Sequence, residues 1–166
     1  MKLFSALALA VLLMLAPSLT AKGATTRITI RGSNSGGSID ITDPTILRKF
    51  NVWSGPGTFV GGLEATEGFI IDWSSGIVTE RPTGLQRYEV SFFADSSNRA
   101  DTPPTYVIFY EHDAASNRGY VYLPGNGDEQ YPLNIREISR GHGLEGKWFL
   151  ATNTWQTAVG PLISRH

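Results

Sequence analysis

The chain has 166 residues, with 14 lysines and arginines against 15 aspartates and glutamates, and it contains no cysteine. The lack of cysteine excludes disulfide bonds, a thiolate metal site and a cysteine nucleophile. The charges are nearly balanced and form no long basic run, which argues against nucleic acid as a partner.

The N-terminal residues have the pattern of a secretory signal peptide. Lys2 precedes an apolar run over residues 3–16, and Pro17 ends this run before a stretch that leads into small residues. We therefore predict a signal peptide over residues 1–21, with cleavage after Ala21 or after Gly23, and a secreted or periplasmic protein. The apolar run is shorter than the about 20 residues of a spanning helix, so we expect no membrane span once the signal is removed.

Residues 22–166 have the size of one domain, and their composition favours β structure. The chain holds 18 glycines and 9 prolines besides 8 phenylalanines, 6 tyrosines and 4 tryptophans, and its turn residues separate short aromatic and β-branched runs. The pair of strands that bounds residues 111–119 is expected to form an antiparallel hairpin. In chain order, the predicted strands are 27–31, 39–41, 69–73, 88–92, 106–110 and 120–123, with weaker patterns at 77–78, 131–135 and 148–150.

Two short helices are expected beside the strands. Asp43 and Pro44 are typical of a helix start, because the aspartate side chain accepts backbone N–H groups and proline has none to leave unpaired. A final helix should be capped at position 152 or 153 and should stop near Val159, because a glycine and a proline follow. The predicted fold is mainly β: an antiparallel sheet, either sandwich-like or part of a small α+β domain, with one or two short helices.

The densest group of ionisable residues is Glu111, His112 and Asp113, at the end of a predicted strand. Histidine titrates near neutral pH and carboxylates can orient or charge it, so the three are candidates for acid–base catalysis or metal binding. Side chains alternate along a strand, which puts Glu111 and Asp113 on one face and His112 on the other. The competing and preferred interpretation is a polar strand end that leads into a turn.

Asn126, Asp128 and Glu129 offer oxygen ligands in a glycine-containing turn, which is a pattern that suits calcium. They lack the ligand spacing of an EF-hand loop and its final bidentate glutamate. An ordinary turn at the end of a hairpin is the preferred interpretation. No metal or other cofactor is expected.

Several aromatic residues lie in or beside predicted strands and turns, namely Trp53, Trp73, Tyr110, Tyr120 and Tyr122. If they faced solvent together, they would form a flat platform for sugar rings or for a protein partner. The alternative is that they fill the core, and we assign the tryptophans to the core. Tyr120 and Tyr122 share one face of the hairpin and are the expected exposed pair.

Short segments with a recognisable spacing are spread over most of the chain after the signal: 41–44 with Phe50 and Trp53, then 118–125 (RGYVYLPG), 127–129 (GDE), Tyr131 and 133–134 (LN). Together they resemble an uncharacterised group of small bacterial proteins, many of which are secreted. The resemblance implies a secreted bacterial protein. It carries no known activity, ligand or catalytic residue.

Because the sequence holds no complete catalytic constellation, we expect a secreted binding or structural module with a glycan or a protein as partner. The alternative is an extracellular hydrolase that acts on glycans through paired carboxylates about 5–9.5 Å apart. The candidates are Glu111 and Asp113, or other carboxylates that the fold brings together. A module stabilised by calcium is a further alternative.

Overall fold

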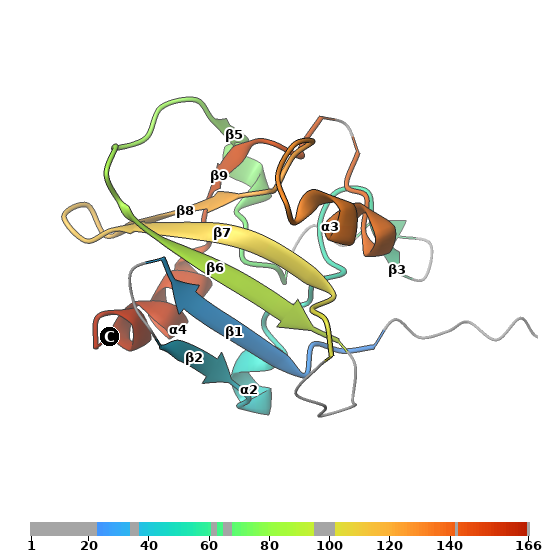
Figure 1. Ribbon diagram of the computed structural model, residues 1–166, viewed down its shortest axis with the longest axis horizontal. Coiled ribbons are helices and arrows are strands. Elements are labelled where there is room, and N and C mark those ends of the chain that lie inside the picture. Colours follow the sequence, from blue (N-terminus) through green and yellow to red (C-terminus); the bar gives the residue numbers. More distant parts are fainter. Residues whose placement is uncertain are drawn as a thin grey trace, which may run out of the picture.

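The computed structural model describes residues 23–33, 37–60, 63–64, 68–94, 102–141 and 143–165. The predicted signal peptide lies outside these residues. The described chain is built on one antiparallel sheet of seven strands, in the order β2-β1-β6-β7-β8-β9-β5 (Figure 1). These strands are β1 (Arg27–Gly32), β2 (Ser38–Ile41), β5 (Ile77–Val78), β6 (Gln86–Phe93), β7 (Tyr106–Asp113), β8 (Arg118–Tyr122) and β9 (Trp148–Leu150).

Short helices and one small hairpin accompany the sheet. A mainly β fold is therefore confirmed, with the seven strands in one open sheet and with three short helices where we expected one or two. In the part of the chain that the structure describes, no helix is both long enough and apolar enough to cross a bilayer. The remaining elements are α2 (Pro44–Leu47), α3 (Tyr131–Glu137), α4 (Asn153–Ile163), the 3-10 helix η2 (Trp73–Ser75), and the hairpin of β3 (Phe59–Val60) and β4 (Leu63–Glu64).

The core lies on one face of the sheet, because side chains alternate between the two faces along each strand. The helix α4 covers this face, behind the sheet in Figure 1, and its buried residues Trp155, Val159 and Ile163 recur at helical spacing. The Trp155 ring meets the ring of Phe50 edge-on, with centroids 5.0 Å apart. The buried residues of β1, β6, β7 and β8 on this face are Ile28, Ile30, Val90, Phe92, Tyr106, Ile108, Tyr110 and Val121.

The hairpin predicted around residues 111–119 is confirmed as β7 and β8. The two strands pair antiparallel, from Phe109 opposite Tyr122 to Asp113 opposite Arg118. Asn117 in the turn adopts a positive φ of 51°, a backbone conformation that asparagine tolerates better than most residues.

The prediction of a strand at residues 69–73 is wrong. This segment forms only an isolated bridge, between Ile71 and Ala151. The side chain of Asp72 accepts the backbone N–H of Ser74 and starts η2, so a local capping bond replaces the ladder that the apolar pattern predicted.

Both predicted helix starts are confirmed, but one predicted element type and one predicted helix end are wrong. Asp43 caps α2, and Thr152 caps α4. Residues 131–135 form α3 instead of a strand, since a proline in the first turn suits a helix. The helix α4 does not stop near Val159 but continues through Pro161 to Ile163, which is buried against the core.

Candidate functional site

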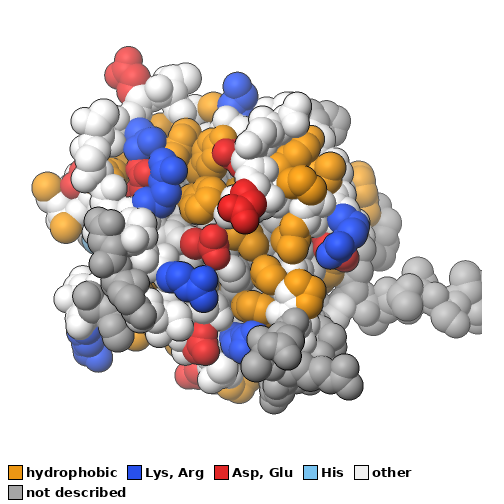
Figure 2. Space-filling view, viewed as in Figure 1, with side chains coloured by type: hydrophobic (Ala, Val, Ile, Leu, Met, Phe, Trp, Pro, Cys, Tyr) orange, Lys and Arg blue, Asp and Glu red, His pale blue; other side chains and the backbone are white. Residues whose placement is uncertain are grey.

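The face of the sheet opposite α4 carries hydrophobic side chains among charged ones (Figure 2), and some of them form an aromatic row. The row follows the strand register from Glu89 in β6 to Phe109, Tyr122 and Trp148 in β7, β8 and β9. Phe109 and Tyr122 stack with ring centroids 6.3 Å apart, and Tyr122 lies 5.0 Å from Trp148. All three rings are half-buried. This aromatic row (Phe109, Tyr122 and Trp148) therefore presents part of its surface to solvent.

Two arginines and one glutamate lie beside the aromatic row. Glu111 is only 3% exposed; its Oε2 pairs with Arg81, and its Oε1 lies 3.0 Å from Nε of Arg87. The Arg81 guanidinium is 3.8 Å from the centre of the Trp148 ring. That of Arg87 is 5.6 Å from the Phe109 ring centre. Charge pairing and cation–π contacts thus hold both guanidinium groups against the rings.

The register of the sheet explains one of these two ion pairs. Arg87 lies directly opposite Glu111 in the β6–β7 ladder, so both side chains point to the same face. Arg81 reaches the same carboxylate from the loop between β5 and β6. A buried carboxylate is costly unless it is paired, and here two cations compensate one anion.

The turn after β8 is closed beside the aromatic row by Asp128. Its Oδ2 accepts the Tyr122 O–H at 2.9 Å and the Gly125 N–H at 2.7 Å. Burial, followed by this hydrogen bond, raises the pKa of the Tyr122 hydroxyl. Asn126 and Glu129 are exposed, and among the described residues no three His, Cys, Asp or Glu side chains form a group that could hold a metal ion. The structure gives Asp128 the role of closing the turn.

The three tyrosines predicted to contact a partner lie in different environments. Tyr110 is buried on the core face, where burial raises the pKa of its hydroxyl. Tyr120 shares the face of Tyr122 but is only 5% exposed, since it lies between Glu111 and Leu150 of the neighbouring strands. The prediction of an exposed pair is therefore wrong for Tyr120, and only Tyr122 reaches the surface.

The cluster of Glu111, His112 and Asp113 is divided as the alternation predicts. Glu111 faces the arginines, whereas His112 lies on the opposite face and stacks on Tyr110 with centroids 6.3 Å apart. Asp113 accepts the Ser116 O–H at 2.5 Å in the β7–β8 turn, and this hydrogen bond lowers the pKa of its carboxyl. The three residues do not converge on one site, and both carboxylates make structural contacts.

Four residues of this face were not among the candidates that the sequence suggested. Phe109 could have been found, because it alternates with Glu111 and stands opposite Tyr122 in the predicted hairpin. Arg87 and Trp148 belong to strands outside the hairpin, and Arg81 belongs to a loop. No local pattern placed these three beside Glu111.

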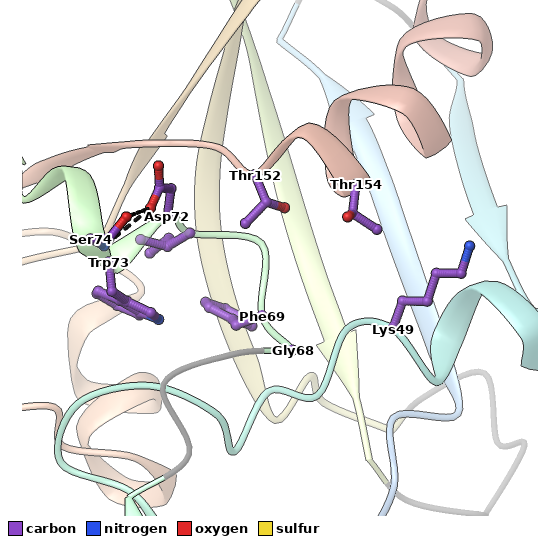
Figure 3. A pocket seen from close by; sticks show the side chains of 9 residues that line it. Lys49, Gly68, Phe69, Asp72, Trp73, Ser74, Thr152 and Thr154 are labelled. Carbon is purple, nitrogen blue, oxygen red and sulfur yellow. Dashed lines mark hydrogen bonds between the residues drawn. The ribbon is translucent and has the colours of Figure 1, made fainter.

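A pocket of about 590 Å³ lies next to the start of α4 (Figure 3). In Figure 3, Lys49 and Asp72 stand at opposite ends, while Phe69 and Trp73 lie across from the two threonines of the α4 segment. Trp53 is buried in the core as predicted, and Trp73 packs against that core half-buried. The residues that line the pocket include Lys49, Phe69, Asp72, Trp73, Thr152 and Thr154.

No protein-family model, curated protein or solved structure matches this chain.

Proposed function

We propose that this protein is a secreted binding module that recognises a protein partner through the open face of the sheet. The observation that carries the proposal is the half-buried aromatic row, flanked by Arg81 and Arg87. Tryptophan, tyrosine and arginine are the residues that most often dominate the binding free energy of protein interfaces. Here they stand together on one face, whereas the core lies on the opposite face.

The arginines are ordered before a partner arrives. Glu111 pairs with both guanidinium groups, which also contact the rings. A side chain that is already ordered loses less conformational entropy on binding. The Arg81 and Arg87 side chains are 26% and 47% exposed, so N–H donors remain for the carboxylate or carbonyl oxygens of a partner.

A protein partner suits this face better than a glycan does. A sugar ring would need a bare aromatic face, whereas the Arg81 guanidinium already lies 3.8 Å from the Trp148 ring centre. The hydroxyl of Tyr122 is likewise bonded to Asp128. The hydrolase alternative gains no support, because neither carboxylate of its candidate pair is free of structural contacts.

A photo-crosslinking experiment tests the proposal. One variant carries a photoreactive residue in place of Arg31, which is exposed on the open face in register with Glu89. A matched variant carries it in place of Thr157, which is exposed on α4. With the exported fraction of the producing cells, we expect a discrete crosslinked protein from position 31 and none from position 157.

Competition completes this test. Unlabelled wild-type protein should abolish the crosslink, and Thr157→Ala should compete equally well. A Trp148→Leu competitor, first shown to be folded by its thermal transition, should be at least about tenfold weaker. Equal competition by wild type and Trp148→Leu, or equal crosslinking from the two positions, would contradict the proposal.

Export is the second part of the proposal and is supported by the signal-like N-terminal segment and by the resemblance to secreted bacterial proteins. We expect the protein recovered outside the cytoplasm to begin at residue 22 or 24, as measured by intact mass spectrometry. A chain that keeps its first residues and stays in the cytoplasm would refute export.

A further inference from the structure

The pocket beside α4 is a second candidate binding site, independent of the open face. Lys49 is exposed at one end and forms no ion pair with any residue that the structure describes. Asp72 lies at the other end (Figure 3). Opposite charges at the two ends orient a ligand, because an anionic group is attracted to Lys49 and repelled by Asp72.

The hydrogen bonds of Asp72 restrict what its end can accept. Oδ1 accepts the N–H and the O–H of Ser74, at 3.1 and 2.6 Å, and Oδ2 accepts the O–H of Ser75 at 2.7 Å. A carboxylate has about four acceptor positions, so at most about one remains. A single position suits a ligand hydroxyl, which donates once, and not an ammonium group, which has about three donors to satisfy.

The walls of the pocket suit a ring that carries hydroxyl groups. The half-buried ring of Trp73 forms the apolar wall; it lies within 13° of parallel to the ring of Phe69, which is only 3% exposed, with centroids 6.4 Å apart. Thr152 and Thr154 supply hydroxyls on the other side; Oγ1 of Thr152 accepts the Trp155 N–H at 3.2 Å and can still donate. The volume of about 590 Å³ is in the usual range for small-molecule sites.

We infer that this pocket binds an acidic monosaccharide unit of the hexuronate type. The sugar carboxylate lies at Lys49, and the pyranose ring packs against the exposed part of Trp73. The ring hydroxyls reach the remaining acceptor position of Asp72 and the hydroxyl of Thr154. Every contact in this arrangement pairs a ligand group with a side chain of matching polarity.

An NMR titration of the purified protein tests the inference. Methyl β-glucuronide should shift the backbone amides of Ser74 and Thr154 in a saturable manner. Methyl β-glucoside has the same ring without the carboxylate and should bind at least about tenfold more weakly, because a charge-assisted hydrogen bond is lost. Phenylalanine serves as a zwitterionic probe and should produce no saturable shift.

Substitution of the lysine gives the matched test. Lys49→Gln should weaken glucuronide binding by about tenfold. Lys147→Gln, at an exposed lysine that does not line the pocket, should leave the affinity unchanged within about twofold. Absence of glucuronide shifts, equal binding of the glucoside, unchanged affinity of Lys49→Gln, or binding of phenylalanine instead would each overturn the inference.

Discussion

At the scale of single residues, the open face shows how a buried carboxylate is accommodated in a strand. Glu111 is in the middle of the sheet, where an unpaired carboxylate would be costly. Its partners Arg81 and Arg87 keep part of their solvent exposure. Desolvation of these three charged side chains therefore costs less free energy than desolvation of a fully buried ion pair.

Removal of the Glu111 charge should have a measurable effect on stability. We expect Glu111→Gln to lower the free energy of unfolding by about 1–3 kcal/mol in urea titrations, because both arginines lose their anion. The control is Glu137→Gln, in an exposed pair whose Oε1 lies 3.1 Å from Arg136 Nε, which should change stability by at most about 0.5 kcal/mol. Equal effects of the two substitutions would refute the structural role of Glu111.

Arg140 is a second charged residue whose surroundings define its role. It is fully buried, and its guanidinium donates to the carbonyls of Ser54 and Val52 at 2.9 and 3.0 Å and to the Tyr106 hydroxyl at 3.2 Å. The guanidinium also lies 4.8 Å from the Phe69 ring centre. This side chain therefore ties the chain after α2 to the segment after α3.

A lysine should not replace this arginine, because one ammonium group cannot reproduce the planar set of donors. We expect Arg140→Lys to lower the free energy of unfolding by about 2–4 kcal/mol in urea titrations and to speed limited proteolysis at residues 51–58. Arg136→Lys, at an exposed position of α3, is the control and should remain within about 0.5 kcal/mol of wild type. Wild-type stability of the Arg140→Lys variant would show that a positive charge alone is sufficient for stability at position 140.

At the scale of elements, one amide docks α3 on the sheet. β8 pairs with β7 only from Phe109 onward, so the edge of Val107 has no strand beside it. The Val107 N–H donates to Oδ1 of Asn134 at 2.8 Å, and Nδ2 of Asn134 donates to the Val107 carbonyl at 2.7 Å. The side-chain amide thus takes the place of the missing strand residue, which satisfies two buried backbone groups.

The docking of α3 should depend on this amide. We expect Asn134→Leu, a substitution of similar size, to lower the free energy of unfolding by about 1–3 kcal/mol, because it leaves the backbone groups of Val107 unpaired. Hydrogen exchange at the Val107 amide should accelerate more than exchange at Ile108, whose N–H lies in the sheet interior. Ile135→Ala, at an exposed position of the same helix, should leave Val107 protected. Unchanged exchange in Asn134→Leu would contradict this account.

At the scale of the whole molecule, three aspartates hold three separate turns. Asp43 caps α2, Asp72 caps η2, and Asp113 closes the β7–β8 turn. The hydroxyl groups of Thr45, Ser74 and Ser116, respectively, are the main cause of a lowered pKa for each carboxyl. Folding therefore stabilises the ionised form of each aspartate.

This linkage predicts how acid acts on the whole chain. Aspartates with a lowered pKa take up protons first in the unfolded state, near about pH 3.9. Their contribution to stability is therefore complete above about pH 5 and is lost as the pH falls through the folded pKa values. In Asp72→Asn, whose amide oxygen can still accept hydrogen bonds, urea unfolding between about pH 3 and about pH 7 should show a shallower acid decline. Identical pH profiles for variant and wild type would contradict this prediction.

Local sequence patterns were sufficient to predict the type of most elements and the face of the sheet to which each strand residue points. The alternation at Glu111, His112 and Asp113 predicted their division between faces, because the period of two belongs to the strand backbone itself. The cap at Asp43 was also predictable, because its hydrogen bond spans only two residues. The prediction of a strand at residues 69–73 failed, because an equally local hydrogen bond to the Asp72 side chain competed with the apolar pattern.

The sequence by itself determined the composition limits, the signal-like segment, the central hairpin and the residues that share a face. Only the tertiary structure decided which strands became neighbours, and therefore that Arg81 meets Glu111, that Tyr120 is buried and that Lys49, Asp72 and Thr154 line one pocket. The physical reason is that period and capping act over a few residues, whereas strand order is set by burial of the whole core, to which distant segments contribute together.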